Sequence, residues 1–354
     1  MRSVKSSQVL VVIAVLAIIV FVALSFVKVF QATPPKTPEL SRAFSEPKTI
    51  GVLFVRQSVL AVEGMKKGLE KLGYTNITFK EVLLDSQATA EDVKELTKGL
   101  VDEKVDLIYA TGELRALGAI DATKEMGNDT PIAYLSTFHD PVAYGLAKSF
   151  VSSKNNATGV SKDIARELER QLEFLRKIRP DSKKIGVFGK GFAVPTIGGV
   201  FLFELKQRAS RFGYEVVEYT TDASPPKAEA AFHAVAAAIK PGDIDALYHI
   251  AGHYFDIQET AESALAARLK VPMVAPIEDL PNGGHFGYSG DWGSAAKQAV
   301  KMVDKIFRGT KPGDIPLEYN EKMSLVVYPM RARLAGVEFP GSVLEIADQV
   351  VNDK

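Results

Sequence analysis

The most enzyme-like pair of neighbouring residues in the chain is His139 and Asp140, in the stretch STFHDPVAYG. A His–Asp pair can serve a hydrolase, but it then needs a nucleophile on a sharp turn. The sequence has no G-x-S-x-G motif and no cysteine. Pro141 biases the residue before it away from helix, so Asp140 is predicted to be a turn or hinge residue whose carboxylate accepts backbone N–H bonds. We therefore expect no catalytic residue, with catalysis by this pair as the alternative.

Metal and nucleotide chemistry are also weakly supported. His249 and His253 are four residues apart, a spacing that can hold zinc on a helix. They fall on a predicted strand and the loop after it, where this spacing does not bring two side chains together. The GKG at 189–191 lacks the GxxxxGK[ST] spacing of a phosphate-binding loop. The sequence thus predicts no metal and no cofactor.

The bulk composition argues against further classes of protein, namely nucleic-acid binders and proteins that depend on cysteine. Lys+Arg and Asp+Glu both number 43, so the formal net charge is zero, and no basic stripe points to nucleic acid. The absence of cysteine excludes disulfides, thiolate catalysis, cysteine-ligated zinc and a lipid-bearing cysteine. A chain of 354 residues is long enough for two domains.

The N-terminus predicts export. Val9–Val27 carries no charge and as a helix would be roughly 28 Å long, close to the thickness of a bilayer core. Arg2 and Lys5 predict that the N-terminus stays inside the cell. We expect residues 1–30 to be a transmembrane signal-anchor and 31–47, rich in Pro, Ser and Thr, to be a linker. A cleaved signal peptide and a buried core helix are the alternatives. With an anchor or a cleaved signal the body is extracytoplasmic, periplasmic or at the cell surface.

The body consists of two half-chains that resemble each other. From residue 49 on, short apolar runs alternate with helical patterns, which predicts α/β structure with parallel sheets covered by helices. KTIGVLF at 48–54 is repeated as KKIGVFG at 183–189, and each following helix ends in a Gly-Tyr corner. Glycine at such a corner suits the left-handed position that ends many helices. The repeat predicts two similar α/β lobes with a cleft between them.

Ligands of parallel sheets bind where the strands end, so the loops after the strands supply the candidate site. For each residue the alternative is a helix cap or a solvent-facing side chain. For Asp291, a helix N-cap and a contact to a ligand amino group are equally open. The candidate ligand-binding residues are Arg56, Gln57, Ser58, Thr111, Gly112, Glu113, Thr137, Asp140, Lys190, His253, Tyr254, Glu278 and Asp291.

Several blocks of the sequence resemble one known family. DPVAYGLAKSF with NNATGVSKDI, then GGHFGYSGDWGSAAKQAVKMVDKIFRGTKPGDIPLEY, then VVYPMRARLAGVEFPGSVLEIA follow in the family's order between about residues 48 and 348. They resemble the substrate-binding proteins of ABC transporters, a family that includes tryptophan- and tyrosine-type binders.

The resemblance implies a type I periplasmic-binding-protein fold, in which two Rossmann-like lobes are joined by a three-strand hinge. It places lobe one at 48–140 and 287–322, lobe two at 158–283 and 329–354, and the hinge crossovers at 141–157, 284–286 and 323–328. A short helix is expected near 142–150 within the first crossover.

The resemblance implies that the chain is an extracytoplasmic solute-binding protein of an ABC-type importer. Its partners would be an amino-acid-like ligand and an ABC permease with a separate ATPase subunit.

 The protein is expected to act as a monomer. A membrane-anchored sensing ectodomain that acts through a signalling partner is the alternative. Glu113, Leu114 and Arg115 replace the small residues usual at their positions in the family, so the identity of the ligand does not carry over.

Overall fold

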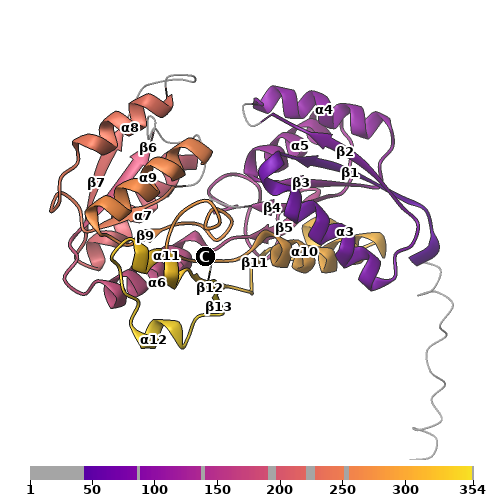
Figure 1. Cartoon of the computed structure of the whole chain (residues 1–354). Helices are drawn as coiled ribbons and strands as arrows, with labels where there is room; N and C mark the ends of the chain where they lie inside the picture. Colours follow the sequence, from indigo (N-terminus) through magenta and orange to yellow (C-terminus); the bar gives the residue numbers. More distant parts are fainter. Residues whose placement is uncertain are drawn as a thin grey trace, which may run out of the picture. The chain divides into compact units, whose positions relative to one another are not determined.

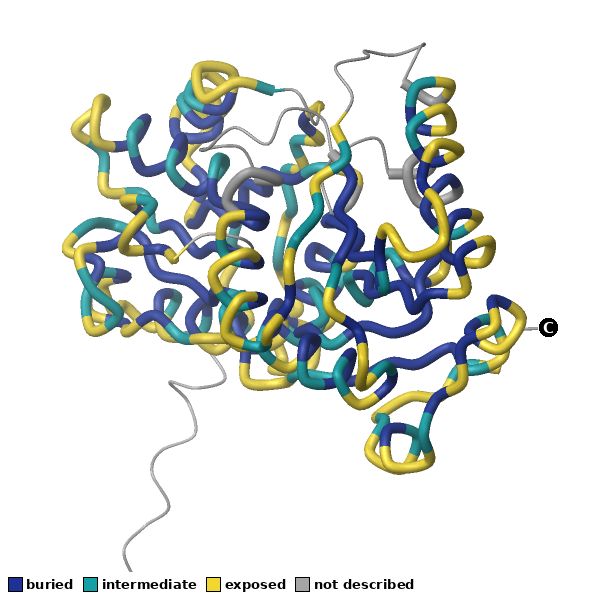
Figure 2. The backbone as a smooth tube through the Cα atoms, turned by 90° about the vertical axis from the view of Figure 1, so that its left-hand side faces the viewer, coloured by how far each residue is buried: buried dark blue, intermediate teal, exposed yellow. Residues whose placement is uncertain are grey.

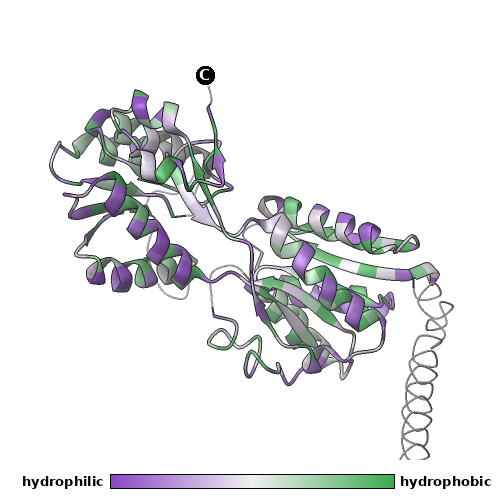
Figure 3. Cartoon of the chain, turned by 90° about the horizontal axis from the view of Figure 1, so that it is seen from below, coloured by the Kyte–Doolittle hydropathy of each residue, from purple (hydrophilic) through white to green (hydrophobic). Residues whose placement is uncertain are grey.

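Two sheets organise the chain, and their strands are built from the aliphatic and β-branched runs of the sequence. The structure is a computed structural model that describes residues 44–85, 88–136, 140–189, 197–220, 228–250 and 255–352. Strands β3, β4 and β5 are buried at every residue, which requires cover on both faces of the sheet. Figure 2 shows long buried runs of backbone inside the body with exposed residues on its outer segments, and Figure 3 shows helices of mixed hydropathy.

The first sheet has the strand order β11-β5-β4-β3-β1-β2, and every pair in it is parallel (Figure 1). Its strands are β1 (Lys48–Phe54), β2 (Ile77–Leu83), β3 (Leu107–Thr111), β4 (Ile132–Ser136), β5 (Ala157–Ser161) and β11 (Glu318–Tyr319).

The second sheet has the order β13-β12-β10-β9-β8-β6-β7, with β12 antiparallel to β10 and the other pairs parallel. Its strands are β6 (Lys184–Gly189), β7 (Glu215–Thr220), β8 (Ala246–Tyr248), β9 (Met273–Val274), β10 (Phe286–Ser289), β12 (Ser324–Val327) and β13 (Gln349–Val350).

The predicted repeat is confirmed by this topology. The series β2-β1-β3-β4-β5 in the first sheet has the same order as β7-β6-β8-β9-β10 in the second. The two Gly-Tyr corners are equivalent as well, because Gly73 has φ 101° and Gly213 has φ 73°, in the left-handed region. The α/β fold with parallel sheets is therefore as predicted.

Helices pack in pairs beside the sheets: α3 on α10, α4 on α5, α6 on α7 and α8 on α9. Val93 and Leu100 of α4 share one apolar cluster with Leu53 and Ile108 of the first sheet. The helices are α3 (Val59–Leu72), α4 (Ala90–Asp102), α5 (Glu113–Glu125), α6 (Ile164–Ile178), α7 (Ile197–Arg211), α8 (Ala228–Ala238), α9 (Phe255–Leu269), α10 (Trp292–Phe307), α11 (Pro329–Leu334) and α12 (Gly341–Leu344), with short 3-10 helices η1 (Arg56–Ser58) and η2 (Pro312–Asp314).

The chain passes between the sheets three times. It leaves the first sheet after β5, returns between β10 and α10, whose helix contacts β4 and β5, and leaves again between β11 and β12. These three passages fall at 162–163, 290–291 and 320–323. Because β5 pairs with β4, residues 157–161 belong to the first sheet, although the sequence places lobe two from 158 on.

The expected helix near 142–150 is wrong. Hydrogen-bonded turns occupy this stretch: the N–H of Tyr144 donates to the carbonyl of Asp140, and the N–H of Leu146 donates to that of Pro141. Gly145, at φ 92°, is in the left-handed region and ends any helical run there.

The predicted membrane segment, Val9–Val27, lies outside the described residues. Within the part of the chain that the structure describes, no helix has the length and apolar character needed to cross a membrane.

Candidate functional site

Hydroxyl groups meet at the carboxyl ends of β1 and β3. Ser58, in η1 after β1, has its Oγ 2.7 Å from Oγ1 of Thr111, the last residue of β3. Ser58 also donates to the carbonyl oxygen of Val55 at 3.0 Å, and both hydroxyl-bearing residues are buried. The pair follows from the parallel arrangement, because adjacent parallel strands end at the same edge.

A buried carboxyl group adjoins this pair. Glu113 is the first residue of α5, and its side chain accepts a 3.1 Å hydrogen bond from the hydroxyl of Ser136, at the end of β4. Gly112 has φ 85° and connects β3 to α5, while Arg115 folds back to donate to the carbonyl of Thr111. Burial lowers the pKa of Arg115 from its ordinary value, and the charge of Glu113 opposes the shift. We call Ser58, Thr111, Glu113 and Ser136 the hydroxyl cluster.

A second polar group lies where the chain leaves the first sheet. Lys162 follows β5, and its Nζ is 3.1 Å from Oε1 of Glu278, which follows β9. The side chains of Lys162 and Glu278 are only 9% and 19% exposed. The same ammonium lies 5.1 Å from the ring centroid of Trp292, within the range of a cation–π contact.

Two more carboxyl groups act electrostatically on this ion pair. Burial raises the pKa of Glu167, in α6, to about 7, although Lys162 and the Gly290 N–H, which donates to Glu167 at 3.3 Å, oppose the shift. Burial also raises the pKa of Asp279 to about 6, against the lowering effect of His249. Burial alone would lower the pKa of Lys162, but Glu278 and then Glu167 raise it, and the net shift is upward.

His249 connects Asp279 of this group to a further carboxyl group, that of Glu262. Its Nδ1 is 2.5 Å from Oε2 of Glu262, in α9, and its Nε2 is 3.7 Å from Oδ2 of Asp279. Both His249 and Glu262 are almost completely buried. We call Lys162, Glu167, His249, Glu262, Glu278 and Asp279 the ionic cluster.

Comparison with known proteins gives the family. A family model described as ABC transporter substrate binding protein matches residues 54–351, most of the chain. The chain belongs to this family. A tyrosine-binding protein of Clostridioides difficile (strain R20291) is 27% identical to this substrate-binding protein over 271 residues, which are 75% of this chain and 74% of that protein.

Solved structures support the fold of the substrate-binding protein. A conserved domain protein of Vibrio cholerae O1 biovar El Tor has a TM-score of 0.71 at 22% identity and covers 86% of this chain and 100% of its own. An ABC domain of Streptococcus pneumoniae in complex with L-Trp reaches 0.70 at 22%, with the same coverage. A ligand-free, open substrate-binding protein with adhesive properties from Clostridium difficile reaches 0.67 at 24%, covering 87% of this chain and 100% of its own. The family consists of binding proteins, which agrees with the expectation that the chain is not an enzyme.

The predicted site residues fall into three sets. Ser58, Thr111, Gly112 and Glu113 come together, as the strand-end rule predicts, and Glu278 lies apart from them in the ionic cluster. Thr137, Lys190, His253 and Tyr254 lie outside the described residues, and the side chain of Gln57 is not described either.

The remaining predicted residues have structural contacts. Asp140 accepts from the N–H groups of Val142 and Ala143 at 2.9 and 2.8 Å, the role expected of a turn aspartate. Asp291 caps α10 by accepting from the N–H of Ser294 at 2.7 Å and from its hydroxyl at 2.6 Å. Arg56 is exposed in η1.

Sequence reasoning missed Ser136, Lys162, Glu167, His249, Glu262 and Asp279 as members of these clusters. Ser136 ends a predicted strand and could have been found by the strand-end rule. Lys162 follows TGVS directly and carries the same signal, a charged residue at the end of a buried strand. Glu167 lies on the buried face of α6, where a carboxyl group is unusual, and that contrast was its available signal.

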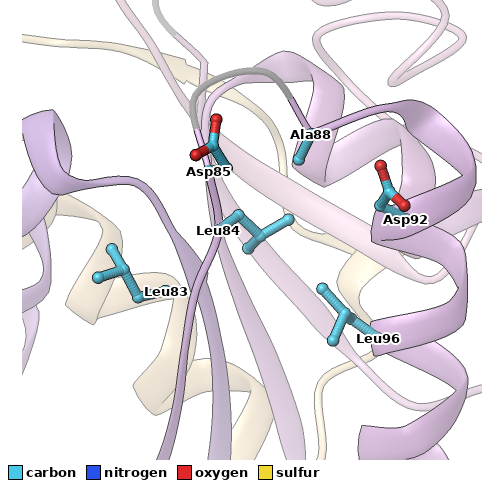
Figure 4. Close-up of a pocket in the computed structure, with 6 residues that line it drawn as sticks. All are labelled: Leu83, Leu84, Asp85, Ala88, Asp92 and Leu96. Carbon is cyan, nitrogen blue, oxygen red and sulfur yellow. The ribbon is translucent and has the colours of Figure 1, made fainter.

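A surface hollow of about 350 Å³ is present between the end of β2 and α4 (Figure 4), and its lining residues include no member of either cluster. Leu83 and Leu96 contribute apolar walls to it, and Asp85 and Asp92 lie at its rim. Asp92 accepts from the N–H of Thr89 at 2.8 Å, so its carboxylate serves the capping box of α4. In the described ranges of the chain, no group of three or more His, Asp or Glu residues could hold a metal ion.

Proposed function

We propose that the chain is the extracytoplasmic solute-binding protein of an ABC-type importer and that it binds a small amino-acid-like ligand between its two sheet-bearing halves. The observation that carries the proposal is the hydroxyl cluster, which combines neutral donors with one carboxylate at the carboxyl edge of the first sheet. Such an edge is where open α/β folds bind their ligands. Hydroxyls and a carboxylate suit the polar groups of such a ligand.

The printed functions of two related proteins support the choice of ligand class. The C. difficile relative is named a tyrosine-binding protein, and the S. pneumoniae structure holds L-Trp. The sequence identities of 27% and 22% leave room for an amino-acid ligand with a different side chain. An α-amino acid is thus the class to test first, and a neutral sugar, which offers hydroxyls but no charge, is the contrasting class.

The proposal includes the setting in which the protein works. The partner would be an ABC permease with a separate ATPase subunit, and the uncharged segment Val9–Val27 would anchor a monomeric protein to the cytoplasmic membrane. The lobe division expected from the family resemblance, with hinge crossovers at 141–157, 284–286 and 323–328, stays a prediction. The passages at 162–163, 290–291 and 320–323 are the places where we propose that the chain bends.

Ligand capture tests this function. The full-length chain is purified in mild detergent, and bound small molecules are released by denaturation and identified by mass spectrometry. Thermal unfolding is then followed with a panel of L-amino acids and neutral sugars, because a ligand that binds only the folded state raises the midpoint by mass action. We expect an amino acid to be captured unaltered and to raise the midpoint. Recovery of a chemically converted compound, or a response to sugars only, would contradict the proposal.

A further inference from the structure

The ion pair between Lys162 and Glu278 has the charges of a zwitterion, and they are buried together near an indole ring. We propose that this pair opens to receive the ligand: the ligand carboxylate binds Lys162, and the ligand ammonium binds Glu278. The inference rests on the proposed function and specifies its ligand as a zwitterionic α-amino acid.

The burial of the pair calls for such an explanation. Moving two charges out of water costs several kcal/mol per ion, and their attraction often fails to offset that cost compared with an apolar pair of the same size. Lys162 and Glu278 are 9% and 19% exposed, so most of this cost applies to them. Stability alone therefore does not account for an ammonium and a carboxylate at this place, whereas recognition of a charged ligand does.

The two residues come from different sheets. Lys162 follows β5 of the first sheet, and its N–H donates to the carbonyl of Ser136 at the end of β4. Glu278 follows β9 of the second sheet, 116 residues later in the chain. Each charge is thus fixed to the end of a different sheet, and a ligand placed between the two would contact one charge on each side.

Exchange of partners conserves charge. A zwitterion brings one positive and one negative group, so one internal ion pair is replaced by two ion pairs to the ligand, and the local net charge is unchanged. A purely anionic or cationic solute would leave Lys162 or Glu278 without its counter-charge in a poorly hydrated place, which is costly. A neutral sugar offers no charge to either residue.

The surroundings of Lys162 suit this exchange. Glu167 and Asp279 also act on the ammonium, so Lys162 keeps negative charge nearby when Glu278 turns to the ligand. The indole of Trp292, whose centroid lies 5.1 Å from the ammonium, supplies an apolar surface beside it. An α-amino acid with an apolar or aromatic side chain fits this combination.

The test removes one charge at a time from protein and ligand. The ligand set is built on the amino acid with the largest thermal shift; for L-tyrosine it consists of L-tyrosine, tyramine, which lacks the carboxylate, and 3-(4-hydroxyphenyl)propionate, which lacks the ammonium. Affinities are measured by calorimetry for the wild type, Lys162→Met and Glu278→Gln. A hydrogen bond to a charged group corresponds to about 10- to 100-fold in affinity, so the wild type should prefer L-tyrosine by that factor over either analogue.

The variants should lose this preference selectively. Lys162→Met should bind L-tyrosine and tyramine equally, and Glu278→Gln should bind L-tyrosine and the propionate equally. Lys66→Met and Glu81→Gln are matched controls, because Lys66 and Glu81 form a 2.7 Å ion pair on the more exposed surface of the first sheet. Both controls should keep the wild-type preference. Circular dichroism and the thermal midpoint of each variant show that it is folded.

The outcomes separate the inference from the function. If the wild type binds amino acids but each site variant keeps its preference for both charges, the exchange of partners is wrong and the proposed function stands. The same conclusion follows if the wild type does not distinguish L-tyrosine from its analogues. If the wild type binds no amino acid, the proposed ligand class fails and the inference fails with it. Should one variant not fold, the other still decides the matter through its own analogue.

Discussion

The hydroxyl cluster and the ionic cluster are both buried polar groups at the ends of strands, but they are stabilised in different ways. In the hydroxyl cluster, Ser58 and Thr111 are neutral and lie 2.7 Å apart, so their burial requires only hydrogen bonds. In the ionic cluster, Lys162 is buried with several carboxyl groups, and two of these, Glu167 and Asp279, have raised pKa values. A neutral cluster can be fixed in place for stability, whereas a buried ionic one needs a further reason to exist.

Breaking the ion pair should give the largest effect. Lys162→Met leaves Glu278 and its neighbouring carboxyl groups buried without their cation, which should lower the free energy of unfolding by about 3 kcal/mol. The double variant Lys162→Met/Glu278→Leu removes both charges and should lie within about 1 kcal/mol of the wild type. Urea unfolding at pH 7 measures both. Equal losses in the single and double variants would show that the pair matters only through its packing.

The ionic cluster should also differ from the hydroxyl cluster in how the stability of the fold depends on pH. The pKa of Glu167 is raised from 4.5 to about 7, so its protonated form stabilises the fold fully below pH 4.5, and this contribution is lost as the pH rises through 7. Between pH 5 and 8 the wild type should therefore lose about 2–3 kcal/mol relative to Glu167→Gln. Urea unfolding across this range gives the difference, and parallel curves for the two proteins would contradict the raised pKa.

A glycine inside β5 should show a smaller, steric effect. Gly159 lies in β5, and a Cβ there would come 2.5 Å from both Cδ2 and the carbonyl oxygen of Tyr134. Gly159→Ala should cost about 2 kcal/mol because the sheet must shift. Gly99→Ala is the control: nothing lies within 4 Å of its Cβ, and it should stabilise α4 by about 0.5–1 kcal/mol. A thermal midpoint that stays unchanged in Gly159→Ala would mean that β5 adapts freely.

The smallest effect is expected in the hydroxyl cluster. Thr111→Val keeps the shape of the side chain but removes the partner of Ser58, which retains its contacts to Val55, so the loss should be about 1 kcal/mol. Thr97→Val serves as the reference variant, because the Thr97 hydroxyl donates to a carbonyl of its own helix, 2.7 Å away. This variant should lose no more than about 0.5 kcal/mol of unfolding free energy. If Thr111→Val costs as much as Lys162→Met, the contrast between the clusters disappears.

Much of the fold could be predicted because its elements carry strong periodicity. Helix α6 spans Ile164–Ile178, the limits of its apolar stripe, and β1 spans Lys48–Phe54, one residue from the apolar run. The stretch 142–150 was misread because its apolar residues suggest a helix, while a single left-handed glycine, Gly145, decides otherwise. Helical patterns are reliable over four turns and much less so over two.

The hydroxyl cluster was predictable for a different reason, since parallel strands bring their ends together without any knowledge of packing. Single members of the ionic cluster carried a signal in the sequence, but their assembly into one cluster could not be predicted. Lys162 and Glu278 are 116 residues apart, and each alone has the character of a solvated charge after a strand. Their burial depends on how the second sheet meets the first, and no local pattern in the sequence contains that information.

The position of Lys162 in a passage between the sheets has a consequence for the rate of ligand release. Lys162 lies in the passage at 162–163, and Trp292 directly follows the passage at 290–291. If the chain bends at these points, the residues that bind a solute are also the residues that move when the solute is released. A substitution there would then alter residence time and opening rate together, so that tight retention and rapid delivery could not be tuned independently at this site.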